Sequence, residues 1–121
     1  MRIAAPQERS KYRNKRTHID GKTFDSKGEA GRYVELMRLQ AAGLIVNLLT
    51  QVRFPLVIVG EFGKVVREYR ADFVYVEDGK RIVEDFKGCK TREYLLKREL
   101  MKALLGITIR ETGGKKRANY R

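Results

Sequence analysis

Residues 65–87 constrain the fold of this chain more than any other segment. β-Branched and aromatic residues fill both halves of the segment, and the Asp78-Gly79 step between them strongly favours a two-residue hairpin turn. We therefore expect two antiparallel strands that are joined by these two residues. This register places Asp72 directly opposite Asp85 near the open end of the hairpin.

Two carboxylates in this arrangement require a cation between them. Directly opposed side chains have Cβ atoms about 4.5–5.5 Å apart, and like charges at that spacing are destabilising. Lys87 lies two residues beyond Asp85 and therefore on the same face of its strand. Carboxylate oxygens are the ligands that Mg²⁺ prefers, and a nearby ammonium can act on a phosphate or on the attacking water. The hairpin predicts a metal site, and a charge-balanced exposed face is the structural alternative.

The alternation of side chains along a strand decides which acidic residue joins this face. It separates Asp72 from Ala71 and Phe73, which we expect to share the opposite face. On the returning strand it separates Asp85 from Glu84, so Asp85 is the expected partner of Asp72. A register shifted by one residue would reverse both assignments.

A helix is expected before the hairpin, from about residue 25 or 26 to residue 42, where a glycine follows. On a helical wheel Glu29 lies at the border of the buried stripe, and Glu35 points to solvent. Glu29 therefore has two interpretations. It can extend the acidic cluster, or it can complete a capping box with Ser26.

Other segments complete the expected fold. They are a small hairpin over residues 17–24, strands over 45–52 and 54–59 interrupted near Pro55, a helix from Thr91 to about Leu105, and a strand over 107–110. Gln51 is a polar residue at the end of one of these strands. This order of elements predicts a single α/β domain over residues 1–121, with a mixed β-sheet flanked by helices.

The charge balance favours nucleic acid as the partner. The 121 residues include 27 Lys and Arg against 15 Asp and Glu, a formal net charge of +12, and counterion release rewards each cation placed near a phosphate backbone. We expect basic flexible arms at about 1–16 and 113–121, for which ordinary tails are the alternative. The residues expected to contact DNA are Arg13, Lys15, Arg16, Arg70, Lys90, Arg92, Lys97 and Arg98. A non-catalytic DNA-binding module or a subunit of a larger nucleoprotein complex would explain the same charge.

Several other chemistries are excluded by composition. Cys89 is the one cysteine and His18 the one histidine, so neither an internal disulfide, a Ser-His-Asp triad nor a His/Cys zinc site can be assembled. No apolar run approaches the roughly 20 residues of a membrane helix. We therefore expect no membrane partner and a cytoplasmic location.

The acidic residues and the lysine also carry a resemblance. Asp72 in the run ADF, followed by Asp85-Phe86-Lys87 on the next strand, resembles the signature of the PD-(D/E)xK nuclease superfamily, with alanine where the name has proline. Over residues 11–110 the runs FDSKGEAGRYVEL, QVRFPL, ADFVY and VEDFKG are similar to a phage-associated nuclease-like family. The helical glutamate before the hairpin is similar to that of archaeal-type Holliday junction resolvases.

This resemblance implies a restriction-endonuclease-like core and a Mg²⁺-dependent DNA endonuclease, with Mn²⁺ as a substitute. The residues it assigns to catalysis are Glu29, Asp72, Asp85 and Lys87, and those it assigns to the metal are Asp72, Asp85, Glu29 and the Phe86 carbonyl. Gln51 is implied as a supporting residue beside them, and a surface amide is its alternative reading. The expected substrate is branched, junction or nicked DNA in phage recombination or processing. The resemblance also implies a homodimer in the cytoplasm of the host cell.

Overall fold

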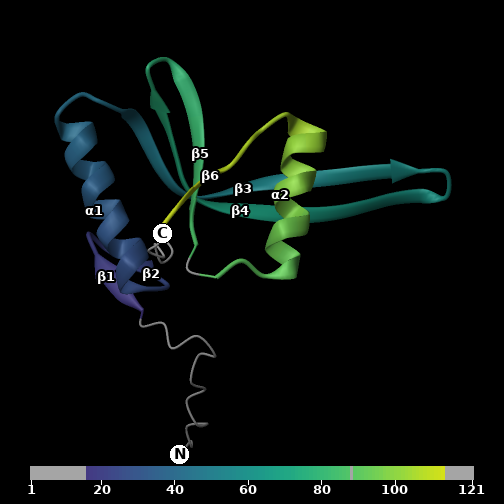
Figure 1. The fold of residues 1–121 in the computed structure, drawn as a ribbon, viewed down its shortest axis with the longest axis horizontal. Coiled ribbons are helices and arrows are strands. Elements are labelled where there is room, and N and C mark those ends of the chain that lie inside the picture. The colour runs from purple at the N-terminus through teal and green to yellow at the C-terminus, as the bar shows by residue number, and fades with distance from the viewer. Residues whose placement is uncertain (1–15, 88, 114–121) are drawn as a thin grey trace, which may run out of the picture.

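The computed structural model describes residues 16–87 and 89–113, which form two helices and six strands (Figure 1). The elements in chain order are β1 (Thr17–Ile19), β2 (Lys22–Phe24), α1 (Lys27–Ala41), β3 (Val46–Gly60), β4 (Gly63–Glu77), β5 (Lys80–Phe86), α2 (Arg92–Leu105) and β6 (Arg110–Thr112). The main sheet has the order β3-β4-β5-β6, and β6 is parallel to β5 while the other pairs are antiparallel. The predicted α/β fold with a mixed sheet and two helices is confirmed.

The hairpin of β4 and β5 has the predicted turn and register. Asp78 and Gly79 are the loop residues, with φ values of 52° and 76° that match a tight turn of left-handed residues. The ladder pairs Phe73 with Glu84 at its inner end. The same offset brings Asp72 beside Asp85, as predicted.

Two strand boundaries differ from the prediction. β3 is a single strand of 15 residues that continues through Pro55, because β3 lies at the edge of the sheet and a proline there leaves no ladder bond unmade. The last strand begins at Arg110 rather than at residue 107. Ile109, just before it, is buried in the core beneath α2.

Strands β3 and β4 each interrupt the regular alternation of side chains between the two faces of the sheet. The interruption occurs at Gln51 in β3 and at Asp72 in β4, which occupy matching positions in the register of this strand pair. Ala71 packs in the core beneath α2, whereas Phe73 packs in the core beneath α1. Strict alternation predicts one shared face for these two residues, and that prediction is wrong. Gln51 has a left-handed φ of 54°, and an irregular residue of this kind bends a strand. In Figure 1, β3 and β4 run beside α1 and then turn away behind α2.

The bend divides the hydrophobic core into two clusters. The cluster beneath α1 contains Phe24, Ala30, Tyr33, Leu36, Ile45, Phe73 and Tyr75. The cluster beneath α2 contains Phe54, Leu56, Tyr69, Ala71, Val74, Val83, Tyr94, Met101 and Ile109. Asp72 lies where the two clusters meet, so packing on both sides holds the backbone around this residue.

Most of the predicted basic arms, residues 1–15 and 114–121, lie outside the described residues. Each described helix is too short or too polar to cross a lipid bilayer.

Candidate functional site

The predicted acidic cluster assembles at the bend. Glu29 comes from the first turn of α1, Gln51 from β3, Asp72 from β4, and Asp85 and Lys87 from the end of β5. The Gln51 amide donates to the Glu29 carboxylate at 3.2 Å, and Lys87 Nζ lies 3.4 Å from Asp85 Oδ1. The carboxyl of Asp72 interacts with those of Glu29 and Asp85. Four segments distant in sequence therefore contribute to one polar cluster.

Asp72 is held by the strand that it faces. Its Oδ2 accepts a hydrogen bond from the backbone N–H of Phe86 at 2.8 Å, just beyond the last paired residues of the β4–β5 ladder. Burial, followed by the charges of Asp85 and Glu29, raises the pKa of Asp72 to about 9. In the absence of a cation, Asp72 therefore keeps its proton at neutral pH.

Asp85 is 2% exposed, and its two oxygens have different surroundings. Oδ2 accepts a hydrogen bond from the phenol of Tyr69. Oδ1 is buried and has no hydrogen-bond partner among residues 16–87 and 89–113, although it forms an ion pair with Lys87. Buried polar atoms are nearly always hydrogen-bonded, so an unpartnered carboxylate oxygen indicates a position for a ligand.

Sequence reasoning missed Tyr69 as a member of this site. Tyr69 and Asp72 are three residues apart, and unbroken alternation would place them on opposite faces of β4. The bend brings Tyr69 to the side of Asp85. No signal in the hydrophobic pattern marks that change of face.

Lys87 is positioned by α2 as well as by Asp85. Its ammonium lies 4.4 Å from the centroid of the Tyr94 ring, a distance at which a cation is attracted to an aromatic face. The Tyr94 hydroxyl donates to Glu111 at 2.6 Å and so fixes the ring. Tyr94 is a second site residue that was not foreseen.

The structure resolves the two interpretations of Glu29. Its backbone N–H donates to the Ser26 hydroxyl at 3.1 Å, so Ser26 is the N-cap of α1 as the capping-box interpretation predicts. Its carboxylate, however, accepts from Gln51 in a residue that is 5% exposed. The backbone of Glu29 therefore belongs to the cap, and its side chain belongs to the cluster. Burial is the largest cause that raises the pKa of Glu29, and Asp25 adds to it.

A glycine contact sets the position of the first turn of α1. A Cβ atom at Gly28 would lie 2.7 Å from the ring of Phe86, and one at Gly113 would lie 2.4 Å from the same ring. The Phe86 ring therefore packs directly against both glycines. This close approach brings Glu29 within reach of the sheet.

The carboxylate of Glu84, the acidic neighbour of Asp85, is occupied by hydrogen bonds within the fold. Its carboxylate accepts from Arg32 Nε at 2.6 Å, from Thr112 Oγ1 at 2.8 Å and from the Tyr75 hydroxyl. Burial opposes ionisation, but these hydrogen bonds outweigh it and lower the pKa of Glu84. As predicted, Glu84 lies apart from the cluster of Asp72 and Asp85.

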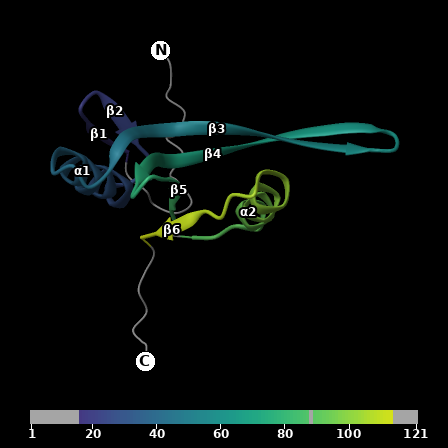
Figure 2. The ribbon, with the colours of Figure 1, turned by 90° about the horizontal axis from the view of Figure 1, so that it is seen from above.

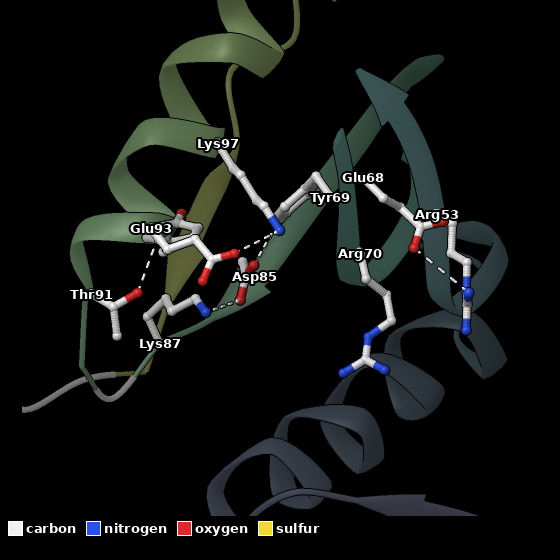
Figure 3. A pocket seen from close by; sticks show the side chains of 10 residues that line it. Arg53, Glu68, Tyr69, Arg70, Asp85, Lys87, Thr91, Glu93 and Lys97 are labelled. Atoms are coloured by element: carbon white, nitrogen blue, oxygen red, sulfur yellow. Dashed lines mark hydrogen bonds and ion pairs between the residues drawn. The ribbon is translucent and has the colours of Figure 1, made fainter. Parts of the chain in front are cut away.

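A pocket of about 360 Å³ opens beside Asp85 (Figure 3). It is lined by Arg53, Glu68, Tyr69, Arg70, Asp85, Lys87, Thr91, Glu93, Tyr94 and Lys97. Figure 3 shows Lys87 and Lys97 on one side, with Arg53 and Arg70 on the other. Arg53 and Arg70 are directly opposed in the β3–β4 ladder, an arrangement that is destabilising unless an anion lies nearby. Glu68, 3.6 Å from Arg53, supplies part of that negative charge.

The predicted DNA-contacting residues fall into four groups. Arg70 and Lys97 line the pocket, and Arg16 and Arg92 are exposed elsewhere. Lys90 and Arg98 are instead paired with Glu111 at 3.1 and 2.8 Å. Arg13 and Lys15 lie outside the described residues.

Within residues 16–87 and 89–113, no three His, Cys, Asp or Glu side chains are already arranged to hold a metal ion. Each of the three carboxylates already accepts a hydrogen bond. Asp72 accepts from the Phe86 N–H, Glu29 from the Gln51 amide, and Asp85 from the Tyr69 hydroxyl. The chemistry of the cluster nevertheless fits a divalent cation, because all three acids offer oxygen ligands and no hydrogen bond from the described residues occupies Asp85 Oδ1. A bound cation would require Asp72 to lose its proton, and the carboxylates of Asp72 and Glu29 to turn towards the cation.

Comparison with known proteins gives one match. A family model described as "Protein of unknown function (DUF1064)" matches residues 9–111. No curated protein and no solved structure is similar enough to count as a match. The matched segment includes every residue of the acidic cluster and of the pocket. The chain therefore belongs to the DUF1064 family of proteins of unknown function.

Proposed function

We propose that this protein is a divalent-metal-dependent endonuclease that hydrolyses phosphodiester bonds in DNA. The observation that supports the proposal best is the buried Oδ1 of Asp85, which accepts no hydrogen bond from the described residues and lies beside two further carboxylates and its ion-pair partner Lys87. A bound Mg²⁺ or Mn²⁺ would polarise the phosphate and activate water. The resemblance to the PD-(D/E)xK nucleases points to the same chemistry.

Each residue of the cluster has a distinct role in this proposal. Asp72 and Asp85 hold the cation from two adjacent strands, with Glu29 and the Phe86 carbonyl as further ligands. Gln51 keeps the Glu29 carboxylate directed at the cluster. Lys87, held by Asp85 and the Tyr94 ring, orients the attacking water or contacts a phosphate oxygen.

The pocket supplies a path for the DNA backbone. Arg53, Arg70 and Lys97 surround a space beside Asp85 that suits phosphate groups. Contacts of this type fix the position of DNA without reading its bases, so we propose selection by shape, as in branched, junction or nicked DNA. Such an enzyme would act in phage DNA recombination or processing, in the cytoplasm of the host.

A non-catalytic DNA-binding module is the second candidate. It is favoured by the hydrogen bonds that already occupy Asp72 and Asp85 Oδ2, donated by Phe86 and Tyr69. In such a module these acids would serve only to hold the strands together. The DNA-binding surface would be the same, and cleavage would be absent.

A plasmid-nicking assay separates the two candidates. Supercoiled plasmid and synthetic four-way junctions are incubated with the 121-residue chain in Mg²⁺, in Mn²⁺ and in EDTA. We expect metal-dependent cleavage that falls at least 100-fold in Asp85→Asn. Asp78→Asn is the matched control, because Asp78 lies in the hairpin turn and asparagine tolerates its φ of 52°. Binding without cleavage in the wild-type protein, or full cleavage by Asp85→Asn, would refute the nuclease proposal.

A further inference from the structure

The outer part of the β3–β4 hairpin extends away from the rest of the fold. We call residues 57–66, with the loop at Glu61 and Phe62, the arm; it begins just beyond Leu56, which is buried beneath α2. β5 pairs with β4 only between Phe73 and Glu77, so within the described residues the arm is a ribbon of two strands. Figure 2 shows the arm reaching past α2.

Apolar side chains are exposed on the arm. Phe62 at the tip is 96% exposed and Val59 is 77% exposed. The other large apolar residues exposed there are Val57, Val65 and Val66. An isolated two-stranded ribbon is marginally stable in water, and contiguous exposed apolar residues mark an interaction surface. The arm therefore has the properties of a surface that is covered by a partner.

The backbone of the arm points to the same conclusion. β3 is the edge strand of the sheet, and its pairing partner among the described elements is β4 alone. Pro55 has no backbone N–H to donate, so the part of the β3 edge that can pair with another strand ends there, at the base of the arm. Residues 56–60 are Leu-Val-Ile-Val-Gly, which have neither charge nor proline. An uncharged, β-branched edge of this kind readily pairs with another strand.

Charge indicates which partner fits. The chain has a net charge of +12, whereas residues 57–66 of the arm carry only Glu61 and Lys64, which cancel, and Arg67 follows at the base of the arm. DNA would find almost no cation there to neutralise its phosphates. Two copies of a strongly basic chain repel one another over most of their surface, but not at this neutral segment.

We propose that the β3 edges of two copies pair antiparallel along residues 56–60, so that the arms form a homodimer. Because the segment is uncharged, a two-fold axis through it brings no like charges together. The two arms then make one four-stranded ribbon, which buries Val57 and Val59 against their counterparts. This pairing does not depend on the nuclease proposal.

The dimer would place two acidic clusters at a separation set by the paired arms. Each cluster lies at the bend from which its own arm extends. Two identical sites related by a two-fold axis suit a substrate with two related strands. The arm therefore provides a physical reason for a paired reaction on branched DNA.

Sedimentation velocity and light scattering test the pairing on the 121-residue chain from about 1 to 100 μM. We expect a dimer in the wild-type protein and a monomer in Val59→Lys, because a lysine at this position places two cations at the interface. Leu96→Lys is the matched control, since Leu96 is an exposed leucine on α2, and it should remain dimeric. A wild-type monomer throughout the range, or a dimer that Val59→Lys leaves unchanged, would overturn the proposal.

Cross-linking identifies the contact itself. Cys89 is a free, exposed thiol, so the background is Cys89→Ser, into which Val59→Cys or Leu96→Cys is introduced. We expect mild oxidation to link Val59→Cys into covalent dimers at low protein concentration and to leave Leu96→Cys monomeric on a denaturing gel. Equal cross-linking of the two variants would contradict pairing through the arms.

Discussion

The phenol of Tyr69 donates a hydrogen bond to Oδ2 of Asp85, while the other oxygen of the same carboxylate is buried and accepts no hydrogen bond within the described part of the chain. This asymmetry orients the carboxylate and leaves Oδ1 for Lys87 or for a cation. The phenol is a poor acid here, because burial and then the charge of Asp85 raise its pKa. Tyr69 is therefore a positioning residue for Asp85 over the whole working pH range.

Tyr69→Phe is expected to weaken metal binding about 10-fold or more, which is typical of removing a residue that orients a ligand. Isothermal titration with Mn²⁺ measures this affinity. Tyr75→Phe is the matched control, since Tyr75 donates to Glu84 instead of to the cluster. Equal losses in the two variants would show that the effect is general destabilisation.

Asp72→Asn is expected to stabilise the metal-free protein at pH 8. The folded state raises the pKa of Asp72 from 3.8 to about 9, so the folded state binds this proton more tightly than the unfolded chain. The contribution of Asp72 to stability is therefore greatest below about pH 4 and declines as the pH rises towards 9. Asparagine avoids the buried charge and can still accept from the Phe86 N–H.

Urea unfolding in EDTA at pH 5 and pH 8 tests this expectation. The advantage of Asp72→Asn over the wild type should be larger at pH 8 than at pH 5. Mn²⁺ at 100 times its dissociation constant should stabilise the wild type by about 2.7 kcal/mol and the variant by much less. A pH-independent difference between the two proteins would contradict the raised pKa.

Gly28→Ala is expected to destabilise the protein by about 1–3 kcal/mol, the range typical of overpacking. Its Cβ would lie 2.7 Å from the Phe86 ring, which Gly113 confines on another side. Gly31→Ala on the same helix is the matched control. Nothing lies within 4 Å of a Cβ there, so the helix propensity of alanine should stabilise that variant by about 0.5–1 kcal/mol. Thermal unfolding compares them, and similar values for both would contradict the packing argument.

Arg53→Gln and Arg70→Gln should each weaken DNA binding and lower the salt dependence of its association constant. The slope against the logarithm of salt concentration is expected to fall by about 0.7–0.9 for each phosphate contact that is lost. Fluorescence anisotropy in EDTA measures binding without cleavage. Arg38→Gln, at an exposed position in the last turn of α1, should leave the slope unchanged. Unchanged slopes for Arg53→Gln and Arg70→Gln would exclude the pocket as a phosphate site.

Local sequence signals predicted most of the elements and several of their ends. Asp78-Gly79 set the register of β4 and β5. The capping-box spacing marked Ser26 as an N-cap, because its side-chain oxygen satisfies a free backbone N–H, and Thr91 caps α2 in the same way at the predicted start of that helix. Gly106 ends α2 in the left-handed conformation that glycine adopts without strain. These signals act over a few residues, so the chain carries them whatever surrounds it.

Contacts between segments distant in sequence determined the features that local signals do not predict. Lys90 and Arg98 form ion pairs with Glu111, which is distant in sequence. The sequence alone therefore could not show that these two basic side chains are already paired. The length of β3 and the reach of the arm were equally hidden, because Pro55 interrupts a strand only when both of its edges are paired.

The sequence alone determined that Asp72 would meet Asp85, because a two-residue turn and a period of two leave one register for the hairpin. Only the tertiary structure decided that Tyr69 would join them and that Gln51 is a supporting residue rather than a surface amide. Gln51 adopts a left-handed φ, and the change of face at that point depends on two helices packing on opposite sides of the bend. Alternation is a property of one strand, whereas the face that becomes buried is settled by what packs against it.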